Sequence, residues 1–271
     1  MLAAAGIGAY LLLGGEEVPA PSAWATLGTA DVHSLAFDHA DPSRLYFGHH
    51  DGLLESRDGG RTWQPGALSG ADAMNIRLGD GDLMQIAGHE IYLESRDGGQ
   101  SWQPVPNDLP GLDLHAFVVD PDDAEHAWAF AVGHGLFETT NAGRRWELRT
   151  SENIGAITIF VEDGRPVLVG LSEIGLGRSD DGGRTWQALG RANGQLASLA
   201  AAEDGSVLYA GTTEGLQRST DAGLTWNPTT LNVLPLTIAV SPGDPSIVAV
   251  VDDGTRFYRS PDAGGTWPGP G

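Results

Sequence analysis

The chain of 271 residues contains no cysteine and no lysine. The absence of cysteine excludes disulfide bonds, thiolate zinc sites and catalysis by a thiol. All 15 basic residues are arginine, and because 36 residues are acidic the formal net charge is −21. Such an acidic surface repels phosphate backbones and anionic lipid headgroups. We therefore expect no nucleic-acid partner, and membrane contact only through the N-terminal segment.

The chain also has few long apolar runs. The longest, "LAAAGIGAYLLLGG", lies near the N-terminus. It has the length of a signal-peptide core but lacks the basic residues that usually precede one, and it is shorter than the roughly 20 residues of a membrane span. We expect residues 1–22 to form a signal-like or anchor segment with a linker, and residues 23–271 to form one folded domain. The protein is then expected to be extracytoplasmic: secreted, periplasmic or tethered to a membrane.

An eight-residue motif occurs six times along the chain. The first copy, "SRDGGRTW", ends at Trp63, and the other five end at Trp102, Trp146, Trp186, Trp226 and Trp267. The intervals are 39, 44, 40, 40 and 41 residues, a period typical of repeat architectures. Within a period, short runs such as "SVLYAGT" alternate with Gly and Asp turns and show no helical periodicity. Each period predicts a four-stranded antiparallel meander, and six in series predict a β-propeller.

The motif resembles the Asp-box, or BNR, signature S-x-D-x-G-x-T-W of sialidase-like, sortilin-type and photosystem II assembly-factor propellers. The resemblance extends from about Trp24 to Trp267 and is closest to exported bacterial propellers labelled glycosyl hydrolase-like. It implies an all-β fold, a six-bladed β-propeller of four-stranded blades, with seven blades as the alternative. It also implies that the boxes are structural and lie away from the channel. The box positions are Asp58, Asp97, Asn141, Asp181, Asp221 and Asp262.

The residue types of the box suit a rigid turn. The carboxylate can accept backbone N–H groups of the turn, the glycine can take a positive φ, and the tryptophan can pack across the neighbouring strand. The third box has Asn141 and Arg145 in place of Asp and Thr, so we expect it to be weaker. The segment "AWATLG" at Ala23–Gly28 follows no box. We expect it to add an outer strand to the last blade and close the ring, because open terminal blades would leave unpaired edges.

Histidines and acidic residues gather at two positions that a blade places around the mouth of the central channel. The inner strand of blades one to three begins Asp-x-His, Asp-x-Met and Asp-x-His, and a histidine follows the glycine at the end of each second strand. Blades four to six carry no histidine at either position. The residues are Asp31, Asp72, Asp113, His33, Met74 and His115 at the first position, and His49, His50, His89 and His134 at the second.

These residue types favour a late first-row metal ion, with copper first and zinc second, because imidazoles are joined by a thioether. We predict His33, Met74 and His115 as the metal ligands and the other seven residues as ligand contacts, the aspartates orienting the imidazoles. One alternative is that the histidines contact a protein or small ligand directly. The other is that they bond to loop carbonyls and line a wet channel.

The sialidase-like resemblance implies a triad of arginines and a tyrosine nucleophile, and neither is found at the mouth. Most arginines lie in or beside the boxes, only Arg77 falls within an inner strand, and no tyrosine lies near an inner-strand start. We therefore expect a non-catalytic binding or assembly module without catalytic residues. The alternative is a glycoside hydrolase at the same face, using a carboxylate pair from Asp31, Asp72, Asp113 or Glu173. A third alternative is a scaffold that binds a membrane protein complex through a flat face.

Overall fold

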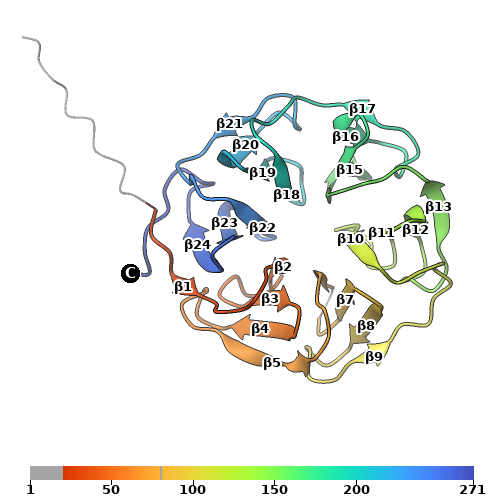
Figure 1. Ribbon diagram of the computed structural model, residues 1–271, viewed down its shortest axis with the longest axis horizontal. Helices are drawn as coiled ribbons and strands as arrows, with labels where there is room; N and C mark the ends of the chain where they lie inside the picture. The colour runs from red at the N-terminus through yellow and green to blue at the C-terminus, as the bar shows by residue number, and fades with distance from the viewer. Residues whose placement is uncertain (1–20, 80) are drawn as a thin grey trace, which may run out of the picture.

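The computed structural model describes residues 21–79 and 81–271. Residues 1–20, most of the predicted signal-like segment, lie outside the described residues. Figure 1 shows six sheets arranged as a ring around a central axis, with the chain passing from one sheet to the next. Each sheet has four antiparallel strands, which confirms the predicted all-β, six-bladed propeller. No helix that could span a bilayer occurs in the described ranges.

The strands of blades one to five follow chain order from the channel outwards. Blade one contains β2 (Ser34–Phe37), β3 (Leu45–His49), β4 (Gly52–Ser56) and β5 (Gln64–Ser69). Blade two contains β6 (Asn75–Leu78), β7 (Met84–Gly88), β8 (Ile91–Ser95) and β9 (Gln103–Pro104). Blade three contains β10 (Leu114–Val119), β11 (Ala127–Ala131), β12 (Gly135–Thr139) and β13 (Glu147–Thr150).

The second half of the ring repeats this plan. Blade four contains β14 (Ile157–Glu162), β15 (Arg165–Ser172), β16 (Gly175–Ser179) and β17 (Gln187–Ala188). Blade five contains β18 (Leu196–Ala201), β19 (Leu208–Thr212), β20 (Gly215–Ser219) and β21 (Asn227–Pro228). Blade six contains β22 (Pro235–Ser241), β23 (Asp244–Asp252) and β24 (Arg256–Ser260), with β1 (Ala25–Thr26) as its outer strand.

The ring is closed by the N-terminal strand. β1 pairs antiparallel with β24, and Ala25 lies opposite Phe257. The Trp24 indole N–H donates to the Pro268 carbonyl at 2.7 Å, and its ring meets the ring of Phe257 edge-on. The predicted closure is confirmed, and the seven-blade alternative is wrong.

The hydrophobic core is divided into six clusters, each between two neighbouring blades. Between blades three and four, for example, Trp128 and Leu136 pack with Ile159 and Leu168. Because each blade buries its two faces against different neighbours, removal of apolar surface from water stabilises the ring as a whole. The loops at the channel mouth are thereby held at fixed positions.

The boxes are turn-stabilising elements at the outer part of the blades. Asp58 Oδ1 accepts the N–H groups of Arg61 at 3.0 Å and Thr62 at 2.9 Å, and the Thr62 hydroxyl donates to Oδ2 at 2.6 Å. Gly60 has a φ of 98°, and its carbonyl accepts the Trp63 indole N–H at 3.0 Å. In the third box, Asn141 accepts the N–H of Arg145, which has no hydroxyl to add. The predicted weakness of this box has that physical cause.

Candidate functional site

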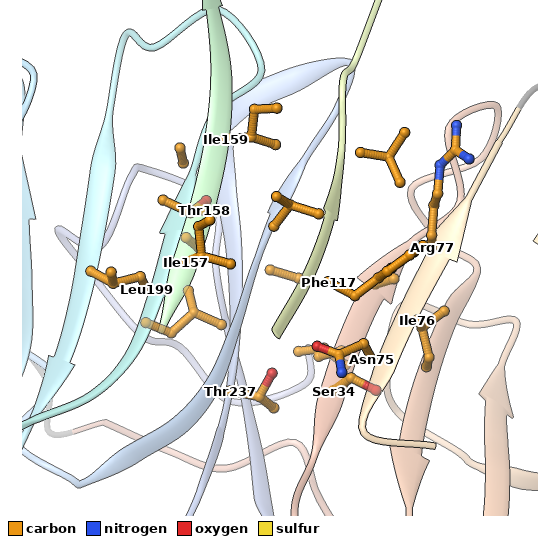
Figure 2. Close-up of a pocket in the computed structure, with 18 of the residues that line it drawn as sticks. Ser34, Asn75, Ile76, Arg77, Phe117, Ile157, Thr158, Ile159, Leu199 and Thr237 are labelled. Carbon is orange, nitrogen blue, oxygen red and sulfur yellow. The ribbon is translucent and has the colours of Figure 1, made fainter. Parts of the chain in front are cut away.

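A channel of about 530 Å³ runs along the ring axis and is lined by the six inner strands. Figure 2 shows Ser34, Asn75 and Thr237 gathered towards one end, with the Arg77 guanidinium towards the other. Polar side chains join the inner strands between blades. The Ser34 hydroxyl donates to the Ala73 carbonyl at 2.9 Å, and the Asn75 amide donates to the Leu114 carbonyl at 3.0 Å. These bonds fix the spacing of blades one, two and three at the mouth.

Six equivalent residues, one from each inner strand, border the mouth. Near the mouth, each inner strand pairs with the end of the second strand of its blade, as Ser34 pairs with Gly48 in blade one. The residue directly before that pair is the equivalent position, which is His33 in blade one. The set is His33, Met74, His115, Ala156, Ala197 and Leu236, and all six border the channel. Histidine and methionine are therefore confined to one half of this rim, as the repeat alignment predicted.

The second set of histidines does not occupy a single structural position. His50 and His89 are equivalent, because each is the first residue of a two-residue turn after β3 or β7. His49 is instead the last residue of β3, and His134 is the third residue of a three-residue turn in blade three. The predicted equivalence based on a preceding glycine is wrong, because the third turn is one residue longer.

His89, Asp113 and His115 form a compact group at the mouth between blades two and three. His89 Nε2 lies 3.1 Å from His115 Nε2 and 3.2 Å from Asp113 Oδ1. His115 Nε2 lies 3.0 Å from Asp113 Oδ1. The three side chains are 43–47% exposed, so the group can be reached from solvent.

The backbone explains why residues of different blades meet there. His89 and Asp113 face each other in an antiparallel bridge, and the Glu90 N–H donates to the Leu112 carbonyl at 3.0 Å. Gly88 permits a close approach within blade two, because a Cβ at this position would lie 2.0 Å from the Asp72 carbonyl oxygen. The turn after β7 is thus held against both the start of its own blade and the start of blade three.

Asp72 links this group to a second one. Its side chain is 8% exposed, and Oδ2 lies 2.6 Å from His89 Nδ1 and 3.3 Å from His50 Nδ1. Oδ1 lies 2.9 Å from His33 Nε2. A nearly buried carboxylate therefore contacts three imidazoles from blades one and two.

The second group contains Asp31, His33 and His50. It is more open, because Asp31 oxygens lie 3.9 Å from His33 Nε2 and 3.8 Å from His50 Nδ1. Asp31 Oδ1 also accepts the backbone N–H of His50 at 2.9 Å, which fixes the turn after β3. Part of the Asp31 carboxylate is thus engaged in local structure.

The other predicted site residues lie apart from these two groups. Met74 borders the channel but belongs to neither group. The His49 ring stacks on Phe47 with centroids 6.2 Å apart, and burial lowers the pKa of this imidazole. His134 is exposed and lies beside Gly111.

The predicted metal set of His33, Met74 and His115 is consequently divided in the structure. His33 belongs to one group, His115 to the other and Met74 to neither. Asp113 was predicted as a ligand contact that orients an imidazole, not as a metal ligand, whereas its Oδ1 atom lies in the same triangle as the two imidazole nitrogens. The Asp-x-His spacing of blade three was the signal for this arrangement.

Comparison with known families gives a match between residues 20–176 and the family described as Photosynthesis system II assembly factor YCF48. No curated protein matches the chain.

Several solved structures are similar in fold. YCF48 bound to a D1 peptide has a TM-score of 0.57 and 23% identity, covering 93% of this chain and 86% of that chain. YCF48 from Cyanidioschyzon merolae has a TM-score of 0.55 and 20% identity, covering 91% and 88%. The GH74 xyloglucanase from Xanthomonas campestris has a TM-score of 0.57 and 17% identity, covering 86% of this chain but only 45% of the enzyme. At these identities the likeness concerns the fold alone.

Proposed function

Because the chain belongs to the family of the photosynthesis system II assembly factor YCF48, we propose that it is a non-catalytic module that binds a segment of a partner protein. A propeller of similar fold, YCF48, has been solved with a D1 peptide. The proposed binding face of this chain is the channel mouth of blades one to three, with a metal ion bound there. Copper and then zinc are the ions that the His and Met composition favours.

The observation that carries this proposal is the half-ring of histidine and aspartate at the mouth. Asp31, His50, His89, Asp113 and His115 come from three blades and are at least partly exposed, and His50 and His89 both contact the buried Asp72. Imidazoles can donate and accept hydrogen bonds with peptide groups and can bind metal ions, so such a rim suits a polar peptide segment. The predicted contacts His49 and His134 belong to neither of the two groups.

The proposal includes an extracytoplasmic location. It rests on the apolar run before the propeller, with residues 1–22 as signal-like or anchor segment and residues 23–271 as the binding domain. Fusion of residues 1–22 to a reporter enzyme that is active only after export would test this. A reporter that stays in the cytoplasm would contradict it.

Peptide selection tests the binding face with no assumption about the sequence of the partner. A random peptide library displayed on phage is selected against the full chain, and selected peptides are measured with His50→Ala, His115→Ala and Thr213→Ala. Thr213 is the matched control, because it occupies the turn position of His50 in blade five. We expect the two histidine variants to weaken binding at least tenfold and Thr213→Ala to leave it unchanged. Selected peptides that are insensitive to both histidine changes would contradict the proposal.

A glycoside hydrolase at the same mouth is the second candidate, favoured by the carboxylates there and by the fold likeness to GH74 enzymes. However, Asp72 and Asp113 lie within 3.3 Å of imidazole nitrogens, where they are suited to hold histidines rather than to act as a free acid. A panel of aryl glycosides separates the two candidates. Release of the aryl group by the wild-type chain, and its loss in Asp113→Asn, would favour the hydrolase.

A further inference from the structure

The three donor atoms of the compact group form a nearly equilateral triangle. The distances between His89 Nε2, His115 Nε2 and Asp113 Oδ1 are 3.0, 3.1 and 3.2 Å. Donor atoms about 2.0–2.1 Å from one zinc ion lie about 2.9–3.4 Å from each other in tetrahedral or octahedral geometry. The triangle therefore has the size of one face of a metal coordination polyhedron.

The contacts around His89 leave its Nε2 atom facing the other two donor atoms. Asp72 Oδ2 lies 2.6 Å from His89 Nδ1, a distance at which Nδ1–H donates to the carboxylate. In the neutral imidazole, His89 Nε2 then has a lone pair that is directed at the other two donors. A proton on His115 Nε2 can satisfy that lone pair, but Asp113 Oδ1 then remains a buried atom without a hydrogen-bond partner. A cation between the three atoms would satisfy all of them.

Asp72 supplies an independent observation at the same place. This carboxylate is more than nine-tenths buried, and its Oδ1 atom forms no hydrogen bond of acceptable geometry although it lies 2.9 Å from His33 Nε2. Burial of a carboxylate oxygen without a hydrogen-bond partner is costly unless positive charge lies nearby. Its contact with His89 Nδ1 is the carboxylate–histidine arrangement that commonly orients and strengthens a metal-binding imidazole.

We propose that His89, Asp113 and His115 bind a divalent first-row transition-metal ion, with Zn²⁺ as the preferred ion, and that Asp72 positions His89. Two imidazoles and one carboxylate are a donor set that zinc accepts, with further coordination positions left open. Met74 is not in the group, so the thioether that favoured copper is absent from this donor set. The inference rests on the proposed function for the location of the binding face and specifies the ion, its ligands and the positioning residue.

The remaining coordination positions of the ion are accessible from the channel mouth. The three side chains are 43–47% exposed, so solvent reaches the group at the channel mouth although Asp113 Oδ1 itself is buried. A water molecule, or a carboxylate or imidazole of a bound peptide, can then complete the coordination. This gives an acidic protein a positively charged point at its proposed binding face.

The experiment measures Zn²⁺ binding to the full chain by titration calorimetry after removal of metals with a chelator and in the absence of peptide. We expect one equivalent of Zn²⁺ per chain. His115→Ala and Asp113→Asn should weaken binding at least tenfold, and Asp72→Asn should weaken it about 10–100-fold. His39→Ala changes a histidine that belongs to neither group at the mouth, and it should keep the wild-type equivalent and affinity.

Two further measurements keep the proposal falsifiable. Far-UV circular dichroism must show that each variant retains the propeller, and Asp113→Asn, an exposed change, is the variant expected to fold without difficulty. Substitution with Co²⁺ should give visible absorption bands that Asp72→Asn shifts, which a merely structural role of Asp72 would not do. A chain that binds no Zn²⁺, or one whose binding is lost in His33→Ala but not in His115→Ala, would overturn the proposal. Because no peptide is present, the outcome is independent of the phage selection.

Discussion

The two halves of the channel rim share a backbone but differ in side chains. Between blades two and three, the Asn75 amide donates to the Leu114 carbonyl at 3.0 Å; between blades five and six, the Ser198 hydroxyl donates to the Pro235 carbonyl at 2.9 Å. The inner strands of blades three and six both have a bulge at the rim residue. That residue is His115 in blade three and Leu236 in blade six.

The backbone is arranged alike at both junctions, but only the junction of blades two and three has the histidine and aspartate side chains that could bind a metal ion. Thr213, the counterpart of His89, donates its N–H to the Gln195 carbonyl and accepts the Gln195 N–H with its hydroxyl at 3.0 Å. These contacts stabilise the turn of blade five locally. At the other junction, His89 contacts a carboxylate of its own blade and two side chains of the next.

The largest expected effect comes from Gly88→Ala. Its Cβ would lie 2.0 Å from the Asp72 carbonyl oxygen, so the backbone must move and Asp72 and His89 must separate. We expect a loss of stability of about 1–3 kcal/mol and at least a tenfold loss of Zn²⁺ affinity. Urea denaturation and Zn²⁺ titration measure the two effects.

Gly211→Ala is the control in blade five. It lies one residue before Thr212, the counterpart of Gly88, and its Cβ would lie 2.2 Å from Ser198 Oγ and 2.6 Å from the Pro235 carbonyl oxygen. It should cost similar stability and leave Zn²⁺ affinity unchanged. Equal losses of zinc affinity in the two variants would mean that the two junctions are not distinct.

The zinc-binding group can also be transferred to the junction of blades five and six. Thr213→His, Leu234→Asp and Leu236→His together place the three donor types at the junction of blades five and six, and Gln195→Asp adds the counterpart of Asp72. We expect the fourfold variant to bind a second equivalent of Zn²⁺, about tenfold more tightly than the threefold variant. Titration calorimetry gives both stoichiometries. A variant that folds but binds only one equivalent would mean that the shared frame is not sufficient.

The boxes of the two halves should behave alike. The Ser101 hydroxyl and N–H and the Ser95 hydroxyl lower the pKa of Asp97 in blade two to about 2. The Thr225 hydroxyl and N–H and the Ser219 hydroxyl do the same for Asp221 in blade five. Because each pKa lies below the ordinary value of 3.8, the stabilisation is present above that pH and is lost as the pH falls towards 2.

Asp97→Asn and Asp221→Asn should therefore each lower the Tm at pH 7 by about 2 °C, and the difference from wild type should shrink between pH 4 and pH 2. Thermal unfolding followed by circular dichroism at a series of pH values measures this. A large effect in one blade only would contradict the equivalence of the boxes.

The smallest effect is expected from repair of the third box. Asn141→Asp with Arg145→Thr restores the carboxylate and the hydroxyl that Asp58 and Thr62 provide in blade one. We expect a gain of about 0.5–1 kcal/mol, the usual contribution of one hydrogen bond. Urea denaturation at pH 7 measures it, and an unchanged or lower midpoint would contradict this view of the box.

The fold could be predicted because its determinants are local and repeated. The serine, aspartate, glycine and tryptophan of a box contact one another within eight residues. Each copy of the motif therefore predicts its turn without information from the rest of the chain. The closing strand was also predictable, because an unpaired outer edge in the last blade needs a partner and Ala25–Thr26 follows no box.

The site could be predicted only in part. The Asp-x-His pattern placed His33, Met74 and His115 at equivalent positions, which the strand register supports. Which side chains share a group depends on contacts between turns of different blades. The extra residue in the turn of blade three displaces His134, and the bridge between His89 and Asp113 joins residues 24 positions apart. Neither effect leaves a signal in a single repeat.

Anomalous diffraction at the zinc absorption edge, from crystals of the full chain soaked in Zn²⁺, tests the central claim most directly. The account predicts one strong peak within about 2.0–2.2 Å of His89 Nε2, His115 Nε2 and Asp113 Oδ1, with no equivalent peak between blades five and six. An empty triangle, or a principal zinc peak elsewhere on the propeller, would contradict it.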